Sequence, residues 1–146
     1  MTQPGTWSGG AIALTLRYFP LAFIFGLITP VVTVNGRSVR MGWGSRTVIP
    51  VEPGQHQVHV HAPYFLPSRI GPADLVVPVQ PGQTVELEYK APLWSFSPGS
   101  LGAPPQSYNG RTAMIALMAL LAALVGLPLL CGCIAGLMSM IGGDPS

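Results

Sequence analysis

The feature that most constrains this chain is a long apolar stretch near its C-terminal end. Residues 112 to 141 contain no Asp, Glu, Lys or Arg, and about 20 apolar residues are enough to cross a bilayer as a helix. The sequence therefore predicts one C-terminal transmembrane helix over 112–141. This helix is longer than a bilayer requires, so we expect it to tilt, to bend near Pro128 or to extend into the interface.

The charges that flank this stretch predict its orientation. Arg111 immediately precedes it, and the acidic residue Asp144 lies in the short tail 142–146 that follows. Because cytoplasmic segments of membrane proteins carry an excess of Lys and Arg, the N-terminal side should face the cytoplasm. We therefore expect a plasma-membrane protein whose larger part is cytoplasmic and whose C-terminal tail lies outside.

A second apolar stretch, residues 11 to 33, has two interpretations. It is long and apolar enough for a first transmembrane helix, which would make the chain a two-span protein. However, Ile12, Leu14 and Leu16 alternate with smaller or polar residues up to Arg17, and a period of two indicates a strand. A strand would also let Arg17 point toward water. We favour strands, and the helix remains the alternative.

The middle of the chain predicts many short strands. The sequence "VEPGQHQVHVHA" at 51–62 recurs loosely as "VQPGQTVELEYKA" at 79–91, and Pro-Gly suits the centre of a tight turn. Asn35-Gly36 is a hairpin signal between β-branched residues. These patterns predict an antiparallel β-sandwich, Ig-like in architecture. The expected strands after the opening one are 31–35, 38–41, 46–51, 55–62, 74–80 and 83–90.

Composition then suggests the domain boundaries. Residues 97 to 110 are rich in Pro, Gly and Ser and poor in apolar residues, which is typical of a linker. We expect this linker to act as a tether between the β-domain and the membrane. The predicted organisation is a flexible N-terminus at 1–10, a β-sandwich at 11–96, a linker at 97–111, a transmembrane helix at 112–141 and a tail at 142–146.

The order of these motifs resembles a known group. "PVVTVNGRSV", "RTVIPVEPGQHQVHVHA" and "VPVQPGQTVELEYKAPLWSFSPGSLG", followed by a terminal span, look like a group of small actinobacterial membrane proteins, with a weaker likeness to PEGA-type modules. The resemblance implies strands rather than a span in the opening segment. PEGA-type modules are generally surface or scaffold domains, and proteins of this build can accompany large membrane complexes such as respiratory assemblies.

The three histidines, at positions 56, 59 and 61, are candidate metal ligands. On a strand, His59 and His61 share a face and His56 points to the other. Two imidazoles could bind a metal, but zinc needs further ligands. In a sandwich, Asp74, Glu52, Glu86 or Glu88 could approach them, but the spacing of these residues does not indicate it. A polar strand face is therefore the preferred interpretation. A metal- or small-ligand-binding domain built on His59 and His61 remains the alternative function.

Other catalytic patterns are weak. Glu86 and Glu88 share one strand face and are expected to face water beside Lys90 or an arginine. The serines lie in no nucleophile motif, and a net charge of +2 with scattered arginines does not predict nucleic-acid binding. We therefore expect a non-enzymatic protein that requires no cofactor.

The remaining candidates concern the membrane and partners. Gly132 and Gly136 form a G-x-x-x-G pattern that lets two helices pack closely. We expect an interaction or accessory module of a membrane complex, or a homo-oligomer through this helix. Candidate interaction aromatics are Tyr64, Phe65, Trp94 and Phe96, and candidate contacts with lipid headgroups are Arg37, Arg40, Arg46 and Arg111.

Overall fold

The structure of the chain is a computed structural model that describes residues 9–143. These residues form two compact units, one ending at Arg111 and one beginning at Thr112. The first unit, called the β-domain below, contains eight strands and a short 3-10 helix, and the second is the body of one long helix. The elements are β1 (Gly10–Arg17), η1 (Phe23–Leu27), β2 (Val31–Val34), β3 (Arg37–Val39), β4 (Arg46–Val51), β5 (Gly54–Pro63), β6 (Arg69–Val79), β7 (Thr84–Lys90), β8 (Ser100–Gly102) and α1 (Arg111–Ile141).

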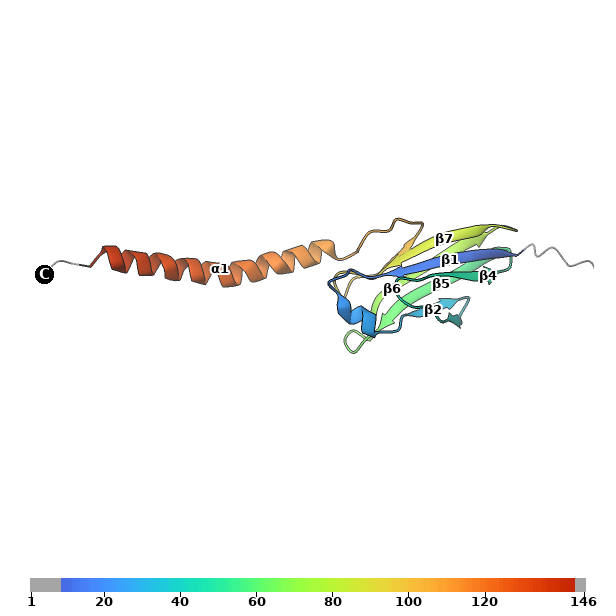
Figure 1. Cartoon of the computed structure of the whole chain (residues 1–146), viewed down its shortest axis with the longest axis horizontal. Coiled ribbons are helices and arrows are strands. Elements are labelled where there is room, and N and C mark those ends of the chain that lie inside the picture. The colour runs from blue at the N-terminus through green and yellow to red at the C-terminus, as the bar shows by residue number, and fades with distance from the viewer. Residues whose placement is uncertain (1–8, 144–146) are drawn as a thin grey trace, which may run out of the picture. The chain divides into compact units, whose positions relative to one another are not determined.

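The strands form two four-stranded sheets, with the orders β4-β1-β7-β8 and β3-β2-β5-β6. Figure 1 shows β1 between β7 and β4 in one layer and β5 and β2 in the other. The predicted β-sandwich with a C-terminal helix is therefore confirmed. One strand pair departs from an antiparallel arrangement, because β1 and β7 run parallel, whereas the other described pairs are antiparallel.

Strand β1 decides between the two interpretations of residues 11–33. Ile12, Leu14 and Leu16 are fully buried, while the side chain of Arg17 on the opposite face is 59% exposed. Burial of each large aliphatic side chain contributes about 1.5–3 kcal/mol, so the alternation stabilises this strand at the centre of its sheet. Residues 11–33 form β1, η1 and most of β2, and the two-span alternative is wrong.

The predicted turns connect strands in two different ways. Asn35 and Gly36 have φ values of 51° and 78° and close the hairpin between β2 and β3, as a two-residue turn with two positive φ values does. The turn at Pro81-Gly82 is closed by a 3.0 Å hydrogen bond from the Gln83 N–H to the Gln80 carbonyl. Pro53-Gly54 and Pro81-Gly82 each carry the chain from one sheet to the other.

The core lies between the inner faces of the two sheets. Its largest fully buried side chains are Ile12, Leu14, Leu16, Val32, Val58, Val60 and Tyr89. Two pairs of alternating residues, Val58 with Val60 in β5 and Leu87 with Tyr89 in β7, all point into this core. The period-two alternation of the sequence therefore assigned the faces of these strands correctly.

The predicted linker at 97–111 is instead part of the folded β-domain. Ser100–Gly102 forms β8, which pairs with β7, and the Gln106 N–H donates a 2.7 Å hydrogen bond to Glu88. The segment packs through backbone and polar contacts, which its low apolar content does not prevent. The predicted N-terminal boundary also changes, because Gly10 begins β1, while residues 1–8 lie outside the described residues.

Helix α1 matches the predicted span. It runs from Arg111 to Ile141, includes Pro128, and contains an 18-residue window with a mean hydropathy of 2.6. None of that window is buried within the protein. The helix is therefore long and apolar enough to cross a membrane. In the tail, Gly142 and Gly143 follow the helix, and residues 144–146 lie outside the described residues.

Candidate interaction surface

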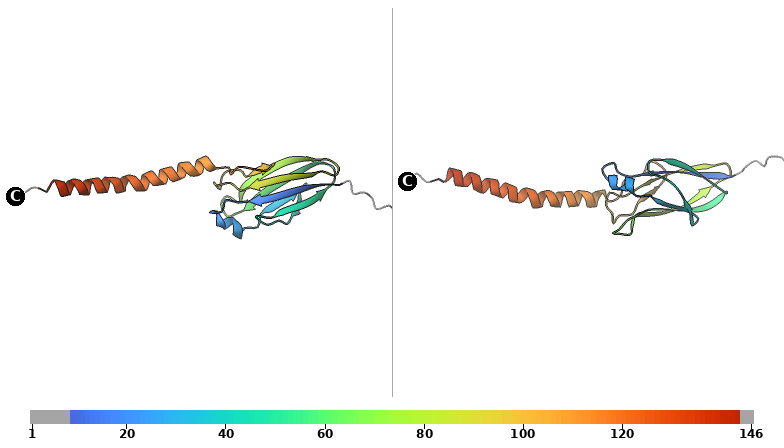
Figure 2. Two further views of the ribbon diagram at one scale, coloured as in Figure 1. Left: turned by 45° about the horizontal axis from the view of Figure 1, so that its top comes forward. Right: turned by 60° about the horizontal axis from the view of Figure 1, so that its bottom comes forward.

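Several loops gather at one end of the sandwich. Parallel pairing of β1 with β7 places Arg17 opposite Lys90 at this end, and β2 begins there, with Val31 opposite His61 of β5. Figure 1 draws η1 in blue and the loop between β5 and β6 in green at this same end, and Figure 2 shows η1 there in both further views. The segments that meet at this end are 18–30, 64–68, 91–99 and 103–110.

Large apolar side chains project from three of these loops. We call six of them the apolar tip: Leu21, Phe23, Leu27, Phe65, Leu66 and Phe96, which are between 68% and 93% exposed. Phe19, Ile24 and Tyr64 on the same loops are between 37% and 41% exposed, and outside the loops of the described β-domain the exposed large apolar side chains are Val48 and Val76. Several exposed large apolar side chains at one end of a domain make that end a candidate interaction site.

Buried aromatic contacts support the tip from beneath. Phe25, in the middle of η1, is only 6% exposed and stacks on Tyr18 with ring centroids 6.1 Å apart. The indole of Trp43 packs edge-on against both rings and donates a 2.8 Å hydrogen bond to the Ile28 carbonyl. One side of η1 is therefore fixed to the domain, and its other side presents Phe23 and Leu27.

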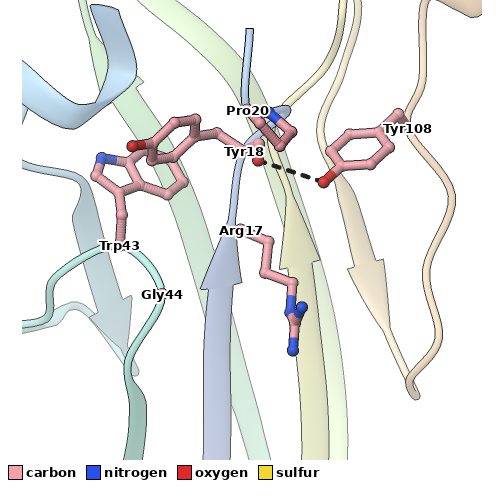
Figure 3. A pocket seen from close by; sticks show the side chains of 6 residues that line it. All are labelled: Arg17, Tyr18, Pro20, Trp43, Gly44 and Tyr108. Carbon is pink, nitrogen blue, oxygen red and sulfur yellow. Dashed lines mark hydrogen bonds between the residues drawn. The ribbon is translucent and has the colours of Figure 1, made fainter. Parts of the chain in front are cut away.

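A shallow pocket of about 440 Å³ lies beside this aromatic group. Figure 3 shows Trp43 and Tyr18 together on one side and Tyr108 on the other, with the Tyr108 hydroxyl directed at the Tyr18 carbonyl. That hydrogen bond is 3.3 Å long. The pocket is lined by Arg17, Tyr18, Pro20, Trp43, Gly44 and Tyr108.

The exposed charged residues around the apolar tip are basic. The four segments that meet at this end contain no charged residue. Three exposed arginines flank them: Arg40 next to the start of β2, Arg69 at the start of β6, and Arg111 after the last segment. We call these three residues the cationic rim.

Three of the four acidic residues of the described β-domain lie away from the tip, and the fourth, Glu88, is buried against Arg17 and Lys90 near this end. Glu52 follows β4 at the opposite end of the sandwich, and Asp74 lies within β6, opposite His59. Glu86 forms an exposed ion pair with Arg46, which lowers the pKa of Glu86 through the hydrogen bond from Arg46 and raises the pKa of Arg46. The apolar end therefore carries positive charge that no acidic residue of the loops balances.

Glu88 is buried, contrary to the expectation that it faces water. It is 6% exposed, and its carboxylate lies 3.0 Å from Arg17 and 3.8 Å from Lys90. It also accepts the backbone hydrogen bond from Gln106, while the Lys90 ammonium lies 4.9 Å from the centre of the Tyr108 ring. Glu88 lies on the outer face of β7, as predicted, but residues 103–108 cover it there.

The last residues of the β-domain are held at the apolar end. The Leu93 N–H donates a 2.8 Å hydrogen bond to the Asn109 carbonyl, and the Asn109 side chain donates to the Pro98 carbonyl at 3.2 Å. Gly110 is so close to Trp94 that a Cβ atom there would lie 2.8 Å from the Trp94 Cβ. The chain is thus fixed to the loops up to the residue before α1.

The structure separates the predicted site residues into groups. Tyr64, Phe65, Trp94 and Phe96 all lie on loops at the apolar end, and the rings of Trp94 and Phe96 are 5.9 Å apart. Sequence reasoning missed the contribution of residues 19–27, because that stretch was considered as part of a strand region or a span. Its exposed aromatic and aliphatic residues next to Pro20 were the available signal.

The four candidate lipid-contact arginines do not form one group. Arg40 and Arg111 belong to the cationic rim. Arg46 is at the start of β4, where it pairs with Glu86. Arg37 follows the Asn35-Gly36 turn at the opposite end of the sandwich, so it lies away from the apolar tip. Arg69 was not predicted as a candidate.

The histidines form hydrogen-bonded contacts on two faces of β5. His59 Nδ1 is 2.7 Å from Asp74 and its Nε2 is 2.8 Å from His61 Nδ1, so His59 donates to Asp74 and accepts from His61 when both rings are neutral. Partial burial, then the neighbouring His59 and Arg69, lower the pKa of His61. His56 points inward and is buried at 8% exposure.

These contacts occupy both ring nitrogens of His59. Within the described residues, no three His, Cys, Asp or Glu side chains are grouped so that they could hold a metal ion. The contact with Asp74 was not predictable from spacing, because it depends on the pairing of β5 with β6. The metal- or small-ligand alternative at His59 and His61 stays a prediction.

The candidate helix-packing residues lie on one face of α1. Gly132 and Gly136 are four residues apart, so they follow one another along the helix surface. Apart from the neighbouring residues and the backbone of α1 itself, no described atom lies within 4 Å of a Cβ built at either position, and the same holds for Gly126. Both glycines are therefore open to a partner helix, and their use stays a prediction.

Together, these features define a β-sandwich domain with an apolar loop end, joined to a helix that is long and apolar enough to span a membrane. A scan against protein-family models found no matching family, and a search of curated proteins found no match.

Proposed function

We propose that this chain is a non-catalytic, membrane-anchored β-domain that acts as an interaction or accessory module of a membrane-associated protein complex. A respiratory assembly is one such complex. The observation that carries this proposal is the packing of residues 97–110 onto the sandwich, which holds the chain to the β-domain up to the residue before α1. A domain attached in this way stays at the membrane surface, where it can present fixed faces to a membrane protein.

The proposed setting is the plasma membrane, with the β-domain in the cytoplasm and the C-terminal tail outside. Arg111 stands at the start of α1 and Asp144 follows its end, and the excess of Lys and Arg on the N-terminal side favours this orientation. The absence of cysteine from the β-domain sequence agrees with a reducing compartment.

The proposed partner contact within the membrane is the face of α1 that carries Gly132 and Gly136. Small residues at this spacing let a second helix approach until the backbones are in contact. The second helix belongs to a subunit of the complex or to another copy of this chain. The faces of the sandwich supply the contacts outside the membrane.

Affinity purification of the full chain from its native host in a gentle detergent tests this proposal. We expect a stoichiometric membrane protein to accompany the wild-type chain. The double variant Gly132→Leu/Gly136→Leu should lose this partner because the leucine side chains separate the helices. Gly126→Leu is the matched control, since Gly126 lies on a different face of the helix, and it should retain the partner. A wild-type chain purified alone would contradict the proposal.

A further inference from the structure

We propose that the apolar tip and the cationic rim together form a docking surface for an anionic lipid bilayer. In this arrangement Leu21, Phe65 and their neighbours enter the interfacial layer, and the arginines of the rim contact lipid phosphates. This inference rests on the membrane anchoring in the proposed function and adds a specific role for the loop end of the β-domain.

The first argument is the position of the tip along the chain. Asn109 and Gly110 are held against the loops 91–99 by hydrogen bonds and close packing, and α1 begins at Arg111. Successive Cα atoms are about 3.8 Å apart, so the loop end cannot move far from the first turn of a membrane-spanning helix. Apolar side chains at this end are therefore within reach of the bilayer interface.

The second argument is the chemistry of the surface. An apolar face with basic residues at its margin is typical of protein segments that lie in the membrane interface. The tip provides aromatic and aliphatic side chains, and its loops contain no charged residue. Arg40, Arg69 and Arg111 provide the positive charge, and anionic lipids attract such residues at the membrane surface.

The third argument is the contrast with the rest of the domain. Exposed large apolar residues outside the loops are isolated, as Val48 and Val76 are, and the opposite end of the sandwich carries Glu52 and the Asn35-Gly36 turn. The combination of apolar residues with unbalanced positive charge is thus confined to the end from which the chain continues into α1. This assignment leaves the sandwich faces and α1 for a protein partner.

Spin-label depth measurements on the purified full chain test the proposal without any partner protein. The two native cysteines are first replaced (Cys131→Ala, Cys133→Ala), and single labels are introduced by Leu21→Cys, Phe65→Cys or Phe96→Cys. Val48→Cys and Val76→Cys are matched controls, because these apolar residues are also exposed but lie on strands. Circular dichroism confirms that each labelled chain keeps its β-structure.

In vesicles of phosphatidylcholine and phosphatidylglycerol, the tip labels should lie about 5–10 Å into the interface, as interfacial apolar faces do. They should collide more often with oxygen than with a water-soluble nickel chelate, and the control labels should show the opposite preference. Tip labels that remain fully accessible to the nickel chelate would overturn the proposal. Tip labels shielded from both oxygen and the nickel chelate would also overturn it, by showing that protein rather than lipid covers the tip.

A charge series tests the role of the rim. We expect the tip labels to lie deeper in vesicles that contain phosphatidylglycerol than in phosphatidylcholine alone. The variant Arg40→Gln/Arg69→Gln should lose this difference, and Arg37→Gln, at the opposite end of the domain, should keep it. Equal behaviour of the two variants would contradict a specific role for the rim. Because only lipid is present, failure here leaves the partner experiment unaffected.

Discussion

At the scale of single residues, Tyr89 joins three parts of the β-domain. Its ring is fully buried, its hydroxyl donates a 2.7 Å hydrogen bond to the Gly71 carbonyl in β6, and burial raises its pKa well above the usual value. A Cβ at Gly99 would lie 2.3 Å from the Tyr89 ring. Tyr89 therefore ties β7 to β6 and to the loop before β8.

We predict that Tyr89→Phe lowers the free energy of unfolding of the β-domain by about 1–3 kcal/mol, because the buried Gly71 carbonyl loses its donor. Urea unfolding of the full chain in detergent, followed by tryptophan fluorescence, measures this change. Tyr64→Phe serves as the control, since Tyr64 is 39% exposed and its hydroxyl can be solvated. Equal midpoints for the two variants would contradict the prediction.

At the scale of elements, prolines lie in one edge strand of each sheet. Strand β4 is an edge of its sheet and contains Pro50, and β6 is an edge of the other sheet and contains Pro72 and Pro78. Proline has no N–H to donate to a neighbouring strand, and it commonly blocks edge-to-edge pairing. A partner is therefore expected to contact side chains rather than to extend either sheet at these strands.

The segment 103–110 is a second element whose attachment can be tested, because it depends on the buried carboxylate of Glu88. Glu88→Gln removes the charge that faces Arg17 and weakens the hydrogen bond from the Gln106 N–H. Hydrogen bonds to charged groups contribute about 1.5–3 kcal/mol. We therefore predict faster amide hydrogen exchange in residues 103–109, measured by mass spectrometry of the full chain in detergent.

Glu86→Gln is the matched control for this prediction. Glu86 lies on the same strand face two residues earlier, but its pairing with Arg46 is exposed to solvent. Exposed ion pairs contribute little to stability, so exchange in residues 103–109 should remain as in the wild type. If both variants showed wild-type exchange, Glu88 would not hold the segment in place.

At the scale of the whole molecule, the order and direction of the strands give the β-domain two chemically different ends. One end holds the apolar tip and the cationic rim, and the other holds Glu52, Arg37 and the hairpin at Asn35-Gly36. The difference follows from the parallel pairing of β1 with β7, which brings the loops after both strands to the same end. A domain with such ends has a preferred orientation at an interface.

The proposed sidedness of the membrane is the prediction that belongs to this scale. Ser38 is exposed next to Arg37, at the end of the sandwich opposite the apolar tip. Ser38→Cys in the Cys131→Ala/Cys133→Ala background offers one accessible thiol. We predict that a membrane-impermeant maleimide does not label this thiol in intact cells and labels it after permeabilisation. Labelling of intact cells to the same extent would place the β-domain outside and would contradict the cytoplasmic orientation.

Local sequence patterns predicted the faces of individual strands well. In β5, alternation placed His59 and His61 on the face opposite Val58 and Val60, and in β1 it separated Arg17 from the core residues. Such predictions succeed because side chains of a strand alternate between two faces, whatever the strand pairs with. The same reasoning could not show that Glu88 is covered or that Asp74 approaches His59, because both contacts join distant segments.

The sequence by itself determined the apolar helix, the strands with their inward faces and the hairpin turn, since each depends on residues close together in the chain. Only the tertiary structure decided that residues 103–110 pack on β7, that β1 lies at the centre of a sheet, and that Phe23, Phe65 and Phe96 share one end of the sandwich. These features arise from pairing between strands that are far apart in the sequence. Each strand has several possible neighbours that would bury its apolar face, so its own sequence does not determine which one it pairs with.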